Sequence, residues 1–252
     1  AHATKVEITF NNDYLCIADN GKGMSKDDLI NKWLFVAYSA KSDGTEDTSY
    51  RSKIKQRHYA GAKGIGRMSC DRLARYLTLT TRSAGEKVEV LKIDWAVFEN
   101  DKQKEFDSIG IPHEILDVIP DFPTGQTTGT ILAFHGLRNV WGKEEILAIK
   151  KSLEKMINPF SGTDDDFKIE IIAPNFIDSD KDAESHSRIN GIVENSIADI
   201  LKIKTTQIES TLHNGKIHTI LYDRGVKMYE IEESNSFSEL SSATISLFYL
   251  NR

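Results

Sequence analysis

Two short glycine-rich segments contain residue types that could bind a nucleotide. They read A-D-N-G-K-G-M at positions 18–24 and G-A-K-G-I-G-R-M-S at positions 61–69. In the second segment the glycines precede a run with helical spacing, and Lys63 and Arg67 add positive charge. A phosphate chain needs backbone N–H donors that it can approach closely, so a glycine turn at a helix N-terminus suits it. The order G-x-x-G-x-G excludes both the dinucleotide fingerprint G-x-G-x-x-G and the P-loop.

The first segment has the residue types that recognise a purine base. Asp19 ends a strand-like run just before Gly21 and Gly23. A fixed carboxylate is a strong acceptor for the exocyclic amine of a purine, which is a donor. The glycines would let the backbone lie against the flat base, and Met24 could pack over it. The same residues also form a common connecting turn between a strand and a helix, so this segment alone leaves both interpretations open.

Local patterning predicts the elements that position these segments. Residues 5–10 and 14–19 alternate as two antiparallel strands, and Ser25 with Asp28 three residues later indicates a helix N-terminus. Residues 39–60 lack periodicity, which is typical of a functional lid or insert. Further predictions are a helix over 67–76, strands over 76–83, 87–94 and 129–137, a helix over 143–157 and a strand over 167–174.

The composition of the sequence changes after about Asp178. A polar run over residues 178–187 is typical of a linker or surface loop. Two strand-like runs then flank Asn214-Gly215, a strong hairpin signal, and residues 243–252 predict a further strand. We therefore expect two domains, residues 1–177 and residues 178–252. The abrupt end at Arg252 favours a second domain that continues further.

Composition narrows the class of protein. The 252 residues are 39% hydrophobic, which is enough to form hydrophobic cores. Their formal charge of -6 argues against a protein that binds nucleic acid over most of its surface. No apolar run approaches a membrane span and no signal peptide is recognisable, so a cytoplasmic location is the default expectation. Two cysteines and scattered histidines without ligand spacing predict no metal site built from such residues.

In order and spacing, the two segments resemble the GHKL superfamily, the Bergerat-fold ATPases that include gyrase, the large heat-shock chaperones, histidine kinases and MutL. The match consists of D-x-G-x-G at Asp19–Gly23, an intervening lid, G-x-x-G-x-G at Gly61–Gly66, and Gly129–Thr130 at the start of a strand. A W-L-x-x-x-x-S-x-K continuation at 33–41 resembles the MutL, MORC and bacterial Hsp90-like branch. The resemblance covers approximately residues 1–174.

The resemblance implies that the chain binds ATP with Mg²⁺. It implies that Asp19 binds the adenine amine, that Gly21, Gly23 and Met24 shape the base pocket, and that Thr130 lies near the aspartate through water. Ser39 and Lys41 are implied as lid contacts. The implied phosphate cradle consists of Gly61, Ala62, Lys63, Gly64, Ile65, Gly66 and Arg67.

One departure from the family pattern concerns catalysis. Relatives carry, on a helix before the first strand, a glutamate that activates water and an asparagine that binds magnesium. This sequence starts at A-H-A-T-K-V-E-I, where that helix would already have ended, so no catalytic residue is assigned. If a preceding segment is missing, an ordinary ATPase is expected. If Ala1 is the true start, the general-base and metal functions are absent. We expect truncation.

The fold expected from the resemblance is α/β: a two-layer Bergerat-fold ATPase sandwich, with a mixed sheet covered on one face by helices, followed by a transducer-like α/β domain. The expected function is an ATPase whose lid closure gates homodimerisation and drives a DNA or protein effector, in a process such as DNA repair or antiviral defence. The alternative is a non-hydrolysing, ATP-responsive interaction module. A histidine-kinase catalytic domain is disfavoured by the transducer-like second half.

Overall fold

The computed structural model describes residues 2–34, 66–100, 110–157, 167–184, 187–195, 197–236 and 239–249. The chain forms two compact units, Ala1–Leu153 with Asp165–Val193, and Glu154–Asp164 with Glu194–Arg252. The first unit thus extends past the boundary expected at residue 177, because β8 (Gly191–Ile192) pairs with β7 (Lys168–Ile172) at the sheet edge. Among the described residues, no helix is long and apolar enough to span a membrane.

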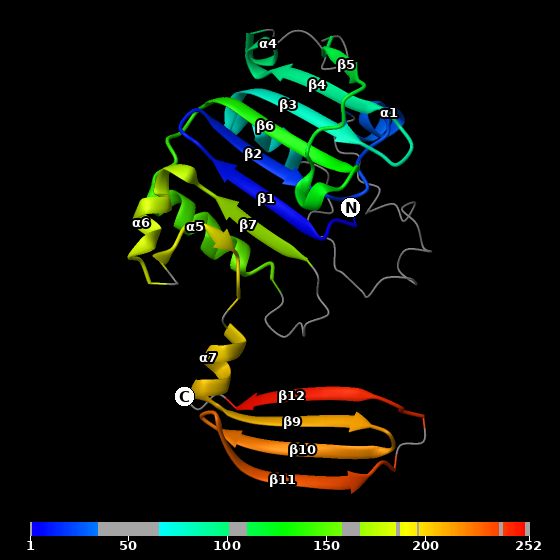
Figure 1. Cartoon of the computed structure of the whole chain (residues 1–252), viewed down its shortest axis with the longest axis vertical. Coiled ribbons are helices and arrows are strands. Elements are labelled where there is room, and N and C mark those ends of the chain that lie inside the picture. The colour runs from blue at the N-terminus through cyan, green and yellow to red at the C-terminus, as the bar shows by residue number, and fades with distance from the viewer. Residues whose placement is uncertain are drawn as a thin grey trace. The chain divides into compact units, whose positions relative to one another are not determined.

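The first unit is built on an eight-stranded mixed sheet in the order β5-β4-β3-β6-β2-β1-β7-β8 (Figure 1). The pairing of β1 with β7 is parallel, and the other pairings are antiparallel. The remaining strands of the sheet are β1 (Lys5–Phe10), β2 (Tyr14–Asp19), β3 (Ala74–Arg82), β4 (Val88–Asp94), β5 (His113–Leu116) and β6 (Gly129–Leu137).

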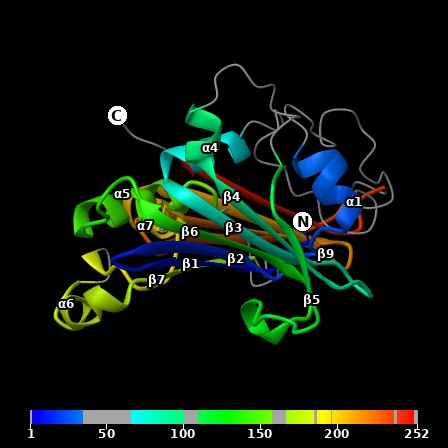
Figure 2. The same cartoon turned by 90° about the horizontal axis from the view of Figure 1, so that it is seen from above.

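The core lies on one face of this sheet. Leu91, Leu79 and Leu132 are register partners across β4, β3 and β6, and Leu29 packs against this row. Leu29 begins a π-helical turn (η1, Leu29–Trp33) that continues α1 (Lys26–Asp28). Figures 1 and 2 show α1 and α5 (Lys143–Glu154) on the same face of the sheet. This mixed α/β architecture is consistent with the expected Bergerat-fold sandwich.

The start of α1 matches its sequence signal. The Ser25 side chain accepts a hydrogen bond from the Asp28 backbone N–H at 3.1 Å, and Asp28 Oδ2 accepts from the Ser25 N–H at 3.2 Å. This capping box satisfies two backbone donors that a helix N-terminus otherwise leaves without partners. The predicted α5 is also confirmed, over Lys143–Glu154.

The predicted helix over residues 67–76 is wrong in its second half. A 3-10 helix covers only Gly66–Arg72 (η2), and β3 begins at Ala74. The spacing of Leu73, Tyr76 and Leu77 is compatible both with a helix and with a strand. Pairing decides between them, because Ala74 lies opposite Leu137 and Leu77 lies buried opposite Phe134. The sheet thus overrides a local helical pattern.

The weakly patterned stretch from residue 95 to 128 contains elements that the sequence did not predict. They are α4 (Trp95–Asn100), β5 and a 3-10 turn, η4 (Pro123–Gly125). After β7, a 3-10 turn, η5 (Pro174–Phe176), and α6 (Ile177–Lys181) lead back to β8.

The second unit contains α7 (Ile197–Lys204) and a four-stranded antiparallel sheet in the order β11-β10-β9-β12. Its strands are β9 (Thr206–His213), β10 (Lys216–Asp223), β11 (Val226–Ser234) and β12 (Ala243–Tyr249). The hairpin predicted around Asn214-Gly215 is confirmed, with φ of 50° and 74° at these residues. The sequence missed β11. The resemblance of this unit to a transducer domain stays a prediction.

Candidate functional site

Three polar side chains line up across neighbouring strands at one end of the core face. Asp19 on β2 is the register partner of Thr130 on β6, and Thr130 is the partner of Thr81 on β3. Each lies two residues along its strand from a residue of the apolar rows, Ile17, Leu132 and Leu79. Because side chains alternate along a strand, the polar residues face the same side as the core. Hydrophobic packing therefore fixes the orientation of this polar row.

Asp19 is a partly buried hydrogen-bond acceptor. Its Oδ1 accepts from the Gly21 backbone N–H at 2.8 Å. Burial raises the pKa of this carboxyl, against the opposing effect of the backbone N–H groups of Gly21 and Thr130. A carboxylate held at a partly desolvated position binds a polar donor more strongly than one in water does. Asp19 can therefore hold an amine at the end of the sheet.

Thr81 ties the site together, and sequence reasoning missed it. Its side chain has 0% exposure. Its Oγ1 accepts from the Met24 N–H at 2.9 Å, donates to the Gly129 carbonyl at 2.9 Å and lies 3.1 Å from Thr130 Oγ1. The strand pattern offered a signal, because Leu77, Leu79 and Thr81 alternate onto one face. A polar residue at a core position is an informative observation.

Two glycines let the backbones of the site meet at close range. Gly23 has a φ of +67°, and a Cβ there would lie 1.9 Å from the Arg82 carbonyl oxygen. Gly129 has a φ of +155°, and a Cβ there would lie 2.1 Å from the Asp19 carbonyl oxygen. Both contacts are with backbone, which cannot move aside as a flexible side chain can. Any side chain at either position would push the Asp19 loop away from β3 and β6.

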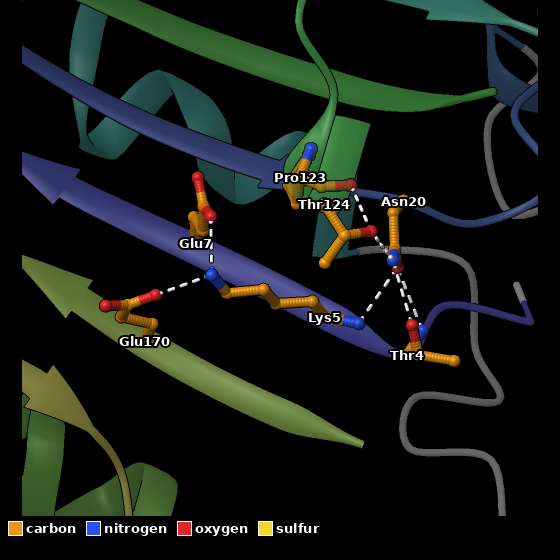
Figure 3. A network of polar contacts seen from close by, with 7 residues as sticks. All are labelled: Thr4, Lys5, Glu7, Asn20, Pro123, Thr124 and Glu170. Carbon is orange, nitrogen blue, oxygen red and sulfur yellow. Dashed lines mark hydrogen bonds and ion pairs between the residues drawn. The ribbon is translucent and has the colours of Figure 1, made fainter. Parts of the chain in front are cut away.

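Asn20 anchors the loop from its other side (Figure 3). Its Oδ1 accepts from the backbone N–H groups of Thr4 and Lys5 at 2.9 Å each, and its Nδ2 donates to the hydroxyls of Thr4 and Thr124 at 2.8 and 2.9 Å. Asn20 is 9% exposed, so these bonds replace water contacts that burial removed. Asn20 thus does more than form a turn, because it ties the loop to the start of β1 and to Thr124.

The Lys5 side chain leaves this network and forms ion pairs with Glu7 at 2.8 Å and Glu170 at 2.6 Å (Figure 3). Both carboxylates raise the pKa of Lys5. The Lys5–Glu7 pair lies within β1, and the Lys5–Glu170 pair joins β1 to β7.

Of the remaining predicted site residues, Gly21 is buried in the loop, and Met24 packs against the Leu29–Leu79–Leu91 cluster. Gly66 and Arg67 begin η2. Ser39, Lys41 and the positions from Gly61 to Ile65 lie outside the described residues. Within the described ranges, no group of three or more His, Cys, Asp or Glu could hold a metal ion.

Comparison with known proteins matches the part of the chain that contains Asp19 and Thr81 to a family. The family model described as "Histidine kinase-, DNA gyrase B-, and HSP90-like ATPase" matches residues 1–122, which include β1 to β5, the Asp19 loop and Thr81. Residues 1–122 therefore belong to a domain of the GHKL superfamily. This assignment confirms the family that the two glycine segments indicated.

Curated relatives place the GHKL domain in the Hsp90-like branch. The chaperone protein HtpG of Chromobacterium violaceum is 39% identical over 84 residues, which are 32% of this chain and 13% of the relative. HtpG of Rickettsia rickettsii (strain Sheila Smith) is 35% identical over 103 residues, 39% of this chain and 16% of the relative. HtpG of Rickettsia canadensis is 39% identical over 90 residues, 35% and 14% of the two chains. The chain matches less than a fifth of the length of these relatives.

Proposed function

We propose that the first unit binds ATP, with the adenine amine held by Asp19. The observation that carries this proposal is the pairing of Asp19 with Thr130 at the end of the core face, in a loop fixed by Asn20 and Gly23. A carboxylate oriented before the ligand arrives binds it without the entropy cost of ordering a flexible side chain. Membership of the GHKL superfamily supports ATP as the nucleotide.

The phosphate end of the nucleotide belongs to the second glycine segment in this proposal. Gly61 to Arg67 would supply backbone N–H groups, and Lys63 and Arg67 would add positive charge. Mg²⁺ would arrive with the triphosphate, since proteins commonly hold it through one or two carboxylates together with substrate phosphates. Ser39 and Lys41 would contact the nucleotide from the lid.

We further propose that the protein hydrolyses ATP and that lid closure gates homodimerisation, which drives a DNA or protein effector. Homology to the Hsp90-like branch supports this proposal. Turnover assays and size-exclusion chromatography of the protein with a non-hydrolysable ATP analogue test it. We expect slow phosphate release and a doubled mass with the analogue. ATP binding with neither effect would favour an ATP-responsive interaction module.

Calorimetric titration of the chain with ATP tests the binding step. Asp19→Asn keeps the side-chain shape but replaces the charged acceptor, and a hydrogen bond to a charged group contributes about 1.5–3 kcal/mol. We therefore expect affinity to fall about tenfold to a hundredfold. The matched control is Asp13→Asn in the exposed β1–β2 turn, which should bind ATP as the native chain does. Equal affinity in native and Asp19→Asn chains would overturn the assignment.

A further inference from the structure

Thr81 has a single hydroxyl proton, and its surroundings determine where that proton goes. A threonine hydroxyl donates one hydrogen bond and accepts two. The Gly129 carbonyl, 2.9 Å away, can only accept, so it takes the Thr81 proton. The Met24 N–H, also at 2.9 Å, can only donate, so it uses one lone pair. With 0% exposure, Thr81 has no bulk water to change this arrangement.

The remaining partner of Thr81 is the Thr130 hydroxyl at 3.1 Å. Since the Thr81 proton is already committed to Gly129, Thr130 must donate to the second lone pair of Thr81. The hydroxyl proton of Thr130 then points away from Asp19, toward β3. Thr130 therefore offers only lone pairs to a ligand, as the ionised Asp19 carboxylate beside it also does.

We infer that Thr81 is a specificity-determining positioning residue, which fixes Thr130 as an acceptor and so selects a 6-aminopurine over a 6-oxopurine. This inference rests on the proposed binding of adenine at Asp19. Adenine presents an amine donor at the ring position where guanine and hypoxanthine present a carbonyl acceptor. Asp19 and Thr130, both acceptors, can pair with the amine but offer no donor to the carbonyl. A carbonyl left without a donor in a desolvated site costs binding free energy.

Thr81→Val removes the hydroxyl but preserves the shape of the side chain. The Thr130 proton then loses its acceptor and can rotate toward the ligand, where it can donate to a 6-carbonyl. Inosine triphosphate is the appropriate probe, because it carries the 6-carbonyl without the 2-amino group of guanine. The ratio of ATP affinity to inosine triphosphate affinity is the diagnostic quantity. A structural role alone would weaken both nucleotides together and leave this ratio unchanged.

The experiment measures both affinities for the native chain and for Thr81→Val, Thr81→Ser and Thr130→Val, with melting curves as a check of folding. We expect the native chain to prefer ATP, Thr81→Val to reduce the preference about tenfold, and Thr81→Ser, which keeps the hydroxyl, to retain it. Thr130→Val leaves Thr81 bonded to Met24 and Gly129, and it should also reduce the preference. If Thr81→Val does not fold, the ratio of the two affinities in Thr130→Val therefore tests the inference.

The following results would contradict the inference. An unchanged preference in Thr81→Val, or in Thr130→Val where Thr81→Val is unfolded, would overturn it while leaving ATP binding intact. Equal binding of both nucleotides by the native chain would also overturn it. A native chain that binds neither nucleotide would overturn the proposed function together with this inference.

Discussion

The Asp19–Met24 loop and the Asn214–Gly215 turn contain the same residue types in different surroundings. Each has an asparagine and a glycine at a change of chain direction, and both Gly23 and Gly215 have positive φ. A Cβ on Gly215 would meet nothing within 4 Å, whereas one on Gly23 would meet the backbone of Arg82. Asn20 is buried in a four-bond network, while Asn214 is exposed. The Gly215 carbonyl accepts one backbone hydrogen bond from beyond its hairpin, from the Asn235 N–H at 2.8 Å, whereas the site loop joins three strands.

The two glycines should show the largest difference between these regions. Gly215→Ala places an alanine at positive φ in open space, which costs about 1–2 kcal/mol. Gly23→Ala adds a backbone clash to the same conformational cost, and we expect a loss above about 4 kcal/mol, in the range that unfolds marginal domains. Chemical denaturation of both variants measures the difference. Similar losses would show that the site loop can move aside.

The two asparagines give a smaller difference of the same kind. Asn20→Ala leaves the backbone N–H groups of Thr4 and Lys5 without their acceptor, and we expect a loss of about 3 kcal/mol. Asn214→Ala, at a φ of 50°, should cost about 1 kcal/mol. Denaturation midpoints provide the comparison. If Asn20→Ala were as mild as Asn214→Ala, the network in Figure 3 would not stabilise the loop.

The smallest expected effect is a pH dependence specific to the site. Burial raises the folded-state pKa of Asp19 above its ordinary value of 3.8. Between these two pKa values the native state holds a proton that the unfolded state has lost, so the stability contributed by neutral Asp19 falls as pH rises through this window. It is fully present below 3.8. ATP binding changes in the opposite direction, because the ionised carboxylate binds the amine.

The measurement is the melting temperature of the native chain and of Asp19→Asn across that pH range. The native chain should lose stability relative to Asp19→Asn as pH rises from 3.8, since asparagine does not titrate. A constant difference between the two melting curves would show that burial does not perturb Asp19.

The sequence predicted features that depend on neighbouring residues. The Ser25 capping box, the Asn214–Gly215 hairpin and the position of Asp19 at the end of a strand are all local patterns, and the structure contains each of them. The partnership of Asp19 with Thr130 was implied only by resemblance to a family. Their direct register across β2 and β6 is consistent with it.

The sequence did not predict features that depend on pairing between distant strands. Local spacing predicts that the helix continues through residues 74 and 75, with Leu73 and Leu77 four residues apart, whereas pairing with β6 from Ala74 onward makes them the start of β3. The role of Thr81 needs the register that places it beside Thr130, 49 residues away. Strand β11 was not predicted, because charged residues interrupt its apolar pattern. Most of its residues are exposed.

A crystal structure of the chain with bound adenine nucleotide tests the central claim most directly. We predict the adenine amine within about 3.2 Å of an Asp19 carboxylate oxygen, with Thr130 beside it and its hydroxyl still directed at Thr81. A nucleotide bound elsewhere, or a base whose amine points away from Asp19, would contradict the account.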